Sequence, residues 1–269
     1  MGHRIFPFMS NQGGVQSTVE PPLEYSPFNP EMTTYTLRPD SIRELFDRVA
    51  PRYDFLNHFL SCRRDVYWRK VAVRQLDGID GWILDVATGT GDVAIEALQQ
   101  RGARRKVVGL DFSEPMLRGA HRKVVKEKVS QRILLSLGDA LTLPFRENTF
   151  GASMIAFGLR NIFKKEKALS EMVRVTKEGG KVIILEFTLP QKGWVSKIYP
   201  FYFMRVLPWV GGLISGDSGA YAYLPESVLR FRYVADYEDL MKRSGLQTEP
   251  SRSLTGGIVS LMVGMKPCP

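Results

Sequence analysis

Short apolar runs alternate with segments of helical periodicity over most of the chain. In one such segment, Lys164–Thr176, apolar residues recur every three or four positions, which is typical of a helix packed on one face. The runs themselves carry few polar residues, as expected of strands buried between two layers of helices. Repeated strand–helix units of this kind predict an α/β fold with a doubly wound, mostly parallel, Rossmann-like sheet. Seven strands are expected, at 82–86, 106–111, 132–137, 151–157, 181–187, 247–251 and 258–265.

Helices are expected before, between and after these strands. Ser41 and Glu44 have the spacing of a capping box, and Pro51 ends the helix that they begin. Ser113 can cap another helix with Pro115 in its first turn, where the missing N–H does no harm. Further helices are expected at 53–60 and 65–76, at 164–176 with Gly179-Gly180 as its end, and from the capping residue Asp236 to Gly245.

Two segments depart from this alternation. Residues 1–39 hold six prolines among polar residues, which predicts a poorly ordered tail over residues 1–40 before a domain at 41–269. Residues 192–224 form an insertion before the last strands, rich in aromatic side chains. Its prolines and its charges argue against a membrane span. Two compatible interpretations stay open: a packed insertion over the sheet edge, and a lid for an apolar substrate at a bilayer surface.

Composition limits the possible classes of protein. The 269 residues suffice for one large domain, and 44% hydrophobic with 24% charged residues is typical of a globular protein. The net charge of +9 favours anionic surfaces, although a solvated basic face explains any single cluster equally well. The two cysteines, Cys62 and Cys268, provide neither a disulfide framework nor metal-ligand spacing, and the N-terminus lacks a signal-peptide core. We therefore expect a cytoplasmic protein without a metal.

The most informative stretch is Ile83–Asp92, in which an apolar run ends at Asp85 and a glycine-rich turn opens a helix. Gly89 and Gly91 allow backbone to approach a ligand closely, and the helix N-terminus favours negative charge. The spacing fits a dinucleotide fingerprint and a methyltransferase loop equally well. On this loop alone, NAD, another nucleotide-type cofactor and a plain strand–helix turn all stay open.

The motifs that follow the loop separate these alternatives. Asp111 ends the second strand, where a carboxylate can accept hydrogen bonds from ribose hydroxyls. Met116 begins the next helix beside it, and Asp139-Ala140 after the third strand offers an acceptor and a small residue to an adenine edge. With the turn Lys177–Lys181, this order resembles class I S-adenosylmethionine-dependent methyltransferases rather than NAD enzymes.

Three further segments sharpen the resemblance. The stretch Phe46–His58, followed by Trp68-Arg69, is similar to the entry motif of the UbiE/MenG family, the ring C-methyltransferases of ubiquinone and menaquinone biosynthesis. Phe157–Asn161 matches that family's signature after the fourth strand, and Leu254–Val259 matches its closing motif. The segment 222–227 is also similar. The resemblance covers residues 42–266 and leaves out the proline-rich tail.

The resemblance implies an S-adenosyl-L-methionine site at the carboxyl edge of the sheet. Many members have Asn where this chain has Asp139, and an Asp accepts a hydrogen bond from the adenine amino group equally well. A Ser contact found in some members is absent, since Ala156 occupies that position. The expected cofactor-binding residues are Asp85, Gly89, Thr90, Gly91, Asp111, Met116, Asp139 and Ala140.

The implied reaction is attack of an electron-rich ring carbon on a sulfonium methyl group. It needs neither a metal nor a covalent intermediate, only alignment and a weakened phenolic proton. A fixed cation beside the phenol oxygen would lower the pKa of the phenol, and Arg160 is the candidate. Tyr53, Asp54 and Asn57 are expected on a helix that closes over the pocket. Asp54 either takes the proton or orients the ring oxygen, and both options stay open.

The implied substrate is a polyprenyl quinol, whose tail stays in a bilayer. That tail and the basic charge together suggest peripheral contact with an anionic membrane at its inner face. Asp65, Trp68 and Arg69 favour demethylmenaquinol over a benzoquinol, although both stay open, as does a homodimer. The alternatives are an NAD oxidoreductase, a methyltransferase for RNA or a soluble metabolite, and a silent binding protein. We expect no nucleic-acid partner, because no basic stripe with interleaved aromatics is present.

Overall fold

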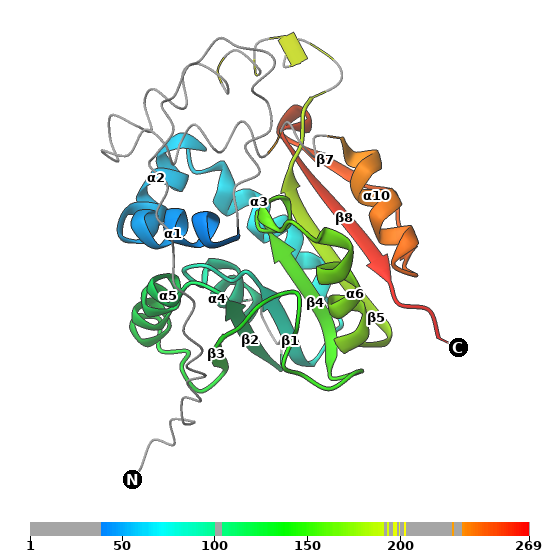
Figure 1. Ribbon diagram of the computed structural model, residues 1–269, viewed down its shortest axis with the longest axis horizontal. Helices are drawn as coiled ribbons and strands as arrows, with labels where there is room; N and C mark the ends of the chain where they lie inside the picture. Colours follow the sequence, from blue (N-terminus) through cyan, green and yellow to red (C-terminus); the bar gives the residue numbers. More distant parts are fainter. Residues whose placement is uncertain are drawn as a thin grey trace, which may run out of the picture. The chain divides into compact units, whose positions relative to one another are not determined.

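The strand–helix alternation folds into one twisted mixed sheet (Figure 1). The computed structural model describes residues 39–99, 104–190 and 233–268, with Gly193, Ser196, Lys197, Tyr199, Tyr202 and Val228 between the last two ranges. All of these residues belong to the unit Leu37–Pro269. The expected disorder of the tail, the insertion 192–224 as a lid, and the motif at 222–227 lie outside the described residues.

Eight strands of the described residues form the sheet, in the order β3-β2-β1-β4-β5-β8-β6, with β7 also paired to β8. The first five run parallel, whereas β8 is antiparallel to β5, β6 and β7. Seven strands were expected, and the eighth is the three-residue β7. The strands are β1 Gly81–Val86, β2 Arg105–Asp111, β3 Ile133–Leu137, β4 Phe150–Ala156, β5 Thr176–Phe187, β6 Gln247–Thr248, β7 Arg252–Leu254 and β8 Val259–Met265.

Alternate residues of the central strands are buried on opposite faces of the sheet. Ile83 belongs to the core under helices α3, α4 and α5, and its neighbour Leu84 belongs to the core under α6 and α10. Both side chains are fully buried, which explains why the runs carry almost no polar residues. The helices are α1 Pro39–Val49, α2 Tyr53–Leu60, α3 Arg64–Val73, α4 Asp92–Gln99, α5 Glu114–Lys126, α6 Lys165–Val175 and α10 Val234–Arg243.

The ends of several helices confirm the expected signals. The Ser113 hydroxyl accepts a hydrogen bond from the Met116 N–H, and Pro115 lies in the first turn of α5. Pro51 lies in a 3-10 turn, Ala50–Arg52, that separates α1 from α2. Gly245 follows α10 with φ +85°, the left-handed conformation that ends helices.

Three expected helix boundaries were wrong. Helix α1 begins at Pro39, so Ser41 lies inside its first turn instead of capping it. Asp236 is the third residue of α10, and its carboxylate accepts from the N–H of the actual N-cap, Tyr233, at 3.2 Å. Helix α6 ends at Val175 because the next residue already begins β5, and the Gly179-Gly180 pair lies inside that strand.

Helices α1 and α2 lie at the end of the sheet toward which the parallel strands point (Figure 1). This is the carboxyl edge, where open α/β sheets bind their ligands. Of the helices in the described part of the chain, none has the length and apolarity needed to cross a membrane.

Candidate functional site

A cavity of about 500 Å³ opens at the carboxyl edge of the sheet. Strand ends form its floor, α1 and the start of α2 form one wall, and the segment after β4 forms the other. Its lining is mainly apolar with a few polar groups, as in most small-molecule sites. The residues that line it are Ile42, Arg43, Phe46, Tyr53, Ala87, Gly89, Leu110, Asp111, Phe112, Met116, Leu137, Gly138, Asp139, Ala140, Leu141, Ala156, Phe157, Gly158, Asn161, Ile162 and Phe163.

Of the expected cofactor-binding residues, five line this cavity directly. Gly89 has φ +56°, and a Cβ there would lie 4.0 Å from the Tyr53 ring. Its backbone therefore faces the cavity without a side chain in the way. Met116, Asp139 and Ala140 lie on the same cavity wall, near the end of β3 and the start of α5. Together with Asp111 they surround one end of the cavity.

Asp111 is the central polar group of this end. It is buried, and its two carboxylate oxygens accept backbone N–H bonds from Gly89 at 2.8 Å and from Ser113 at 2.9 Å. Burial raises its pKa, and the backbone N–H bonds oppose that rise. A carboxylate has about four acceptor positions, so Asp111 retains acceptor capacity toward the cavity. The same side chain thus fixes the loop and faces the cavity.

Asp85 at the end of β1 and the loop residues Thr90 and Gly91 are not among the residues that line the cavity. Asp85 is fully buried and accepts a 2.6 Å bond from the Thr88 hydroxyl, and burial raises its pKa to about 7. Gly91 has φ +83°, and a Cβ there would lie 3.1 Å from that of Ala120. The contacts of Asp85 and Gly91 fix the conformation of the loop. Contact of these three residues with a cofactor stays a prediction.

Tyr53 forms the cavity wall contributed by α2. Burial raises the pKa of its phenol, while Arg160 and a hydrogen bond with Asn57 oppose that rise. The Tyr53 hydroxyl therefore stays protonated near neutral pH and can donate a hydrogen bond. Asn57, one turn further along α2, does not line the cavity itself. Tyr53 and Asn57 are thus neighbours on α2, as expected, and of the two only Tyr53 faces the cavity.

Arg160 lies in a buried ion pair behind the cavity wall. Its guanidinium donates to Glu186 at 2.8 Å and to the Phe157 carbonyl, and it lies 5.4 Å from the Phe187 ring centre. The Glu186 side chain has no exposed area, and that of Arg160 is 6% exposed. Arg160 is not among the lining residues. Direct contact of the Arg160 guanidinium with a substrate ring oxygen stays a prediction. The geometry supports an electrostatic effect of Arg160 on the cavity from behind the residues that line it.

Asn161 is a cavity residue that our sequence interpretation missed. Its Nδ2 lies 3.4 Å from the Phe157 carbonyl, whereas its buried Oδ1 has no hydrogen-bond partner in the described structure. A buried acceptor without a donor is costly, which makes this oxygen a candidate acceptor for a donor group of a ligand. The signal was available, because Asn161 follows Arg160 in the family signature.

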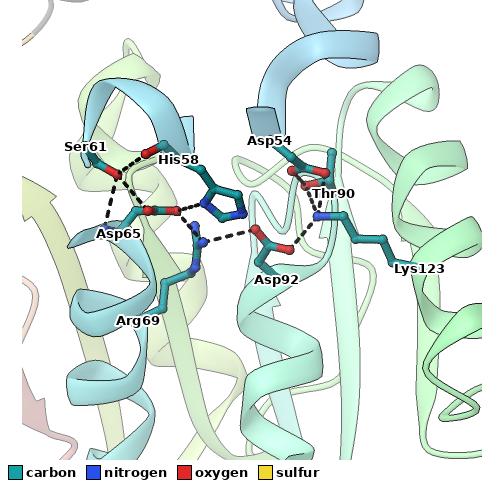
Figure 2. Close-up of polar contacts among 8 residues, drawn as sticks. All are labelled: Asp54, His58, Ser61, Asp65, Arg69, Thr90, Asp92 and Lys123. Carbon is teal, nitrogen blue, oxygen red and sulfur yellow. Dashed lines mark hydrogen bonds and ion pairs between the residues drawn. The ribbon is translucent and has the colours of Figure 1, made fainter. Parts of the chain in front are cut away.

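Asp54 faces away from the cavity. Its Oδ1 accepts from the Thr90 hydroxyl at 2.5 Å, and its Oδ2 lies 2.7 Å from the Lys123 ammonium (Figure 2). Both oxygens are therefore engaged, which disfavours Asp54 as the group that takes a substrate proton. Lys123 is a second residue that the sequence interpretation missed, since it resembles any other lysine of a basic helix.

Comparison with known proteins identifies the architecture. Residues 34–266 match the ubiE/COQ5 methyltransferase family. The chain is 43% identical over 239 residues to a ubiquinone/menaquinone biosynthesis C-methyltransferase of Geobacter sulfurreducens, covering 88% of this chain and 93% of that protein. It is 45% identical over 224 residues to a demethylmenaquinone methyltransferase of Thermus thermophilus, covering 83% of this chain and all of that protein.

The chain belongs to the ubiE/COQ5 methyltransferase family. The resemblance inferred from Phe46–His58, Phe157–Asn161 and Leu254–Val259 is thereby confirmed, and the family match ends at residue 266 as expected but begins at residue 34, eight residues before the expected start. An NAD oxidoreductase and a silent binding protein no longer compete with this assignment.

Solved structures show the same fold in this ubiE/COQ5 methyltransferase and in distant proteins. An S-adenosylmethionine-dependent methyltransferase of Thermotoga maritima matches with a TM-score of 0.60 at 19% identity, over 84% of this chain and 99% of its own. A phosphoethanolamine N-methyltransferase of Haemonchus contortus, solved with S-adenosylhomocysteine, matches with a TM-score of 0.59 at 16% identity, over 85% and 60% of the two chains. The expected class I methyltransferase fold is confirmed.

Proposed function

We propose that this methyltransferase transfers the methyl group of S-adenosyl-L-methionine to a ring carbon of a polyprenyl quinol in respiratory quinone biosynthesis. Family membership and the close relatives support C-methylation in quinone biosynthesis. The observation that carries the proposal within the structure is the division of the cavity. One end of the cavity lies at the carboxyl ends of β1, β2 and β3, which carry Gly89, Asp111 and Asp139, and the other end lies after β4, where the unpartnered Asn161 Oδ1 is found.

The residues at the first end fit the methyl donor. Asp111 has acceptor positions left for ribose hydroxyls, and the Gly89 backbone leaves room that a Cβ would fill. Asp139 accepts from the Leu141 N–H through Oδ1, which orients its carboxylate for an adenine amino group. When bound, the donor supplies an electrophilic sulfonium methyl group. The chain itself positions the reacting atoms and excludes water from them.

The residues at the second end fit an electron-rich ring. Phe157, Ile162 and Phe163 offer apolar contacts to the ring, and Asn161 Oδ1 accepts a hydrogen bond from a ring hydroxyl. This hydrogen bond polarises the O–H bond of the ring hydroxyl. It thereby raises the electron density of the ring carbon beside the hydroxyl. Arg160 holds the Phe157 carbonyl next to Asn161, and its charge favours the phenolate from behind the wall. Asp54 orients α2, and both of its oxygens are engaged. Methyl transfer breaks the bond between sulfur and the methyl group and forms the bond to the ring carbon, S-adenosylhomocysteine leaves, and the proton lost by that carbon passes to solvent.

The finer choice of substrate is demethylmenaquinol rather than a benzoquinol. The relatives carry names from both pathways, and one at 45% identity is a demethylmenaquinone methyltransferase. Asp65, Trp68 and Arg69, which suggested this choice, do not line the cavity; Trp68 donates to Thr255 at 2.7 Å instead. The choice therefore depends on the relatives and on the apolar wall.

Methyl transfer from labelled S-adenosylmethionine to both quinols tests the function. Purified full-length protein is expected to label demethylmenaquinol on a ring carbon at a higher kcat/KM than the benzoquinol. Label on neither quinol contradicts the proposed function, and preference for the benzoquinol contradicts only the finer choice.

The enzyme also makes peripheral contact with an anionic bilayer, where its substrate tail stays. Helix α2, whose Tyr53 walls the cavity, exposes 59% of Phe55 and 52% of Phe59 on its outer side. The two rings stack with centres 6.0 Å apart, and the chain carries +9. Aromatic residues with basic charge favour the interface of anionic membranes.

Liposome flotation at low salt tests this contact. Wild type is expected to float with anionic but not with neutral vesicles, and Phe55→Ser with Phe59→Ser is expected to reduce binding. Leu134→Ser, which removes an equally exposed apolar residue of β3, is the matched control. Absence of wild-type binding to anionic vesicles contradicts the contact.

A further inference from the structure

Lys123 on α5 is the centre of a polar cluster that the chemistry of the cavity does not use (Figure 2). Its ammonium lies 2.7 Å from Asp54 Oδ2, 2.5 Å from Asp92 Oδ1 and 3.0 Å from the Thr90 hydroxyl oxygen. A lysine ammonium has three donors, so these three contacts from three segments use all of them. Lys123 itself does not line the cavity.

The three acceptors connect α2 to the loop of the donor site. Asp54 lies in the first turn of α2, directly after the cavity residue Tyr53. Thr90 follows Gly89, whose N–H holds Asp111, and Asp92 begins α4. A direct bond from the Thr90 hydroxyl to Asp54 at 2.5 Å closes the connection.

A second chain of contacts holds the far end of α2 to the same Asp92. His58 near the end of α2 lies 2.6 Å from Asp65 Oδ2, and Arg69 lies 2.5 Å from that oxygen. Arg69 also reaches Asp92 Oδ2 at 3.2 Å. Asp92 therefore binds Lys123 with one oxygen and Arg69 with the other, and α2 is fixed at both ends (Figure 2).

The charges make Lys123 the sensitive member of this cluster. Asp54 and Asp92 both lie within hydrogen-bond distance of the one nitrogen, so removal of the ammonium leaves two neighbouring carboxylates facing each other. Like charges at this separation repel. Loss of Lys123 therefore pushes α2 away from the loop, in addition to removing a contact.

We propose that Lys123 is a positioning residue of the reaction, which holds α2 and Tyr53 over the methyl-donor site by joining Asp54 to the loop at Thr90 and Asp92. The inference rests on the proposed function only in taking the cavity as the donor site. Lys123 acts through these neighbours and touches neither reactant.

The test measures three quantities on full-length Lys123→Met: the Kd of S-adenosylhomocysteine, amide hydrogen exchange over 53–60, and the split between KM and kcat. Because charge-assisted bonds are lost, we expect the Kd and the KM for the methyl donor to rise about tenfold, with a smaller fall in kcat. Exchange over 53–60 is expected to rise, with little change over β1 and β4. Lys123→Arg, which retains a charge for both carboxylates, is expected to recover most of the affinity.

Two further variants separate this mechanism from a general loss of stability. Lys126→Met removes an exposed lysine one turn along α5 and is expected to behave as wild type. Asp54→Asn breaks the same connection from the α2 side, so it keeps the test decisive if Lys123→Met fails to fold. The two changes together are expected to cost less than Lys123→Met alone, because Asp54→Asn also removes the repulsion between Asp54 and Asp92.

Wild-type affinity and exchange in Lys123→Met would overturn the proposal. So would a uniform rise in exchange with no recovery in Lys123→Arg, since that pattern indicates a purely structural lysine. If wild type binds S-adenosylhomocysteine but methylates neither quinol, the proposed function fails while the affinity and exchange data still decide on Lys123.

Discussion

Asp111 shows how one side chain couples the fold to the binding site. Its carboxylate satisfies two buried backbone N–H groups, and it also faces the cavity at the end of β2. Its position after an apolar strand was readable from the sequence, because carboxyl ends of parallel strands meet at one edge. The bond from the Gly89 N–H was not readable, since it depends on the path of the Thr88–Gly91 loop, whereas the bond from the Ser113 N–H is local in sequence.

Asp111→Ala is expected to raise the Kd of S-adenosylhomocysteine at least about tenfold, since it removes charge-assisted acceptors and leaves the Gly89 and Ser113 N–H groups unpaired. Isothermal titration calorimetry measures the change. Asp139→Ala, at the same end of the cavity, is expected to have a smaller effect. Asp139 accepts one backbone hydrogen bond, from the Leu141 N–H, whereas Asp111 accepts two. Equal affinity of Asp111→Ala and wild type would contradict this account of the site.

The Arg160–Glu186 pair allows the structural and catalytic contributions of Arg160 to be separated. Arg160→Gln leaves Glu186 buried without a cation, which is expected to lower the free energy of unfolding by about 3 kcal/mol. Adding Glu186→Gln is expected to recover most of that stability without recovering turnover. Urea denaturation and the methyl-transfer assay measure the two effects. Recovery of turnover in the double variant would show that Arg160 is structural only.

Asp85 gives the protein a pH dependence of known sign. Burial raises its pKa to about 7, with the charge of Asp111 adding to the rise and the Thr88 hydroxyl opposing it. A carboxyl with a raised pKa in the folded chain favours folding when protonated. Its contribution is therefore complete below the unfolded Asp pKa of ~4, and it is lost as the pH rises through about 7.

Asp85→Asn is expected to reduce this loss, so in thermal unfolding its Tm should fall less than that of wild type between about pH 4 and pH 8, a window that runs from the unfolded pKa of Asp to just above the raised one. Asp111, whose pKa is also raised, causes part of the fall of Tm with rising pH in both proteins. The exposed Asp239→Asn on α10 serves as control. If the Tm of Asp85→Asn falls with rising pH as much as that of wild type, Asp85 is not the source of this pH dependence.

The site residues that the sequence did not reveal depend on packing rather than on residue type. Asn161 lies in the family signature, but its role as an acceptor appears only from its buried and unpartnered Oδ1, and Lys123 is recognisable only because α5 brings it against two carboxylates. Asp54 was placed on the correct helix, but helical phase turns it toward Thr90 and away from the cavity. Such facts need the angle between elements, which hydrophobic periodicity does not contain.

At the scale of elements, apolar runs located every parallel strand, and boundaries failed where local signals competed with packing. The Gly179-Gly180 pair suggested a helix end, but it allows β5 to pass close to β4. A Cβ on Gly180 would lie 2.7 Å from the Gly151 carbonyl oxygen and 2.8 Å from that of Lys177. Gly180 therefore serves strand contact. The short β7 was missed because three residues contain too little periodicity.

Gly180→Ala is expected to lower the free energy of unfolding by about 2 kcal/mol, because the added methyl meets backbone that has no room to move. Urea denaturation measures the change, and Lys177→Ala at an exposed position of β5 is the matched control. An alanine variant as stable as wild type would contradict the close approach of β4 and β5.

At the scale of the whole molecule, the sheet and the N-terminal helices form different parts of the cavity. Five parallel strands direct their carboxyl ends, with Gly89 and Asp111, toward one edge, and the antiparallel β8 closes the other side of β5. Helices α1 and α2, which precede the sheet in sequence, wall the cavity at that edge. In the proposed function, the sheet provides the donor site, and the N-terminal helices with the segment after β4 provide the substrate site.

The most direct test of this division is a crystal structure of the full chain with S-adenosylhomocysteine and a quinol analogue. The account predicts the ribose beside Asp111, the adenine beside Asp139, and the ring hydroxyl within hydrogen-bond distance of Asn161 Oδ1. A structure with the cavity empty or filled by the chain, or with the ring bound away from Asn161, would contradict it.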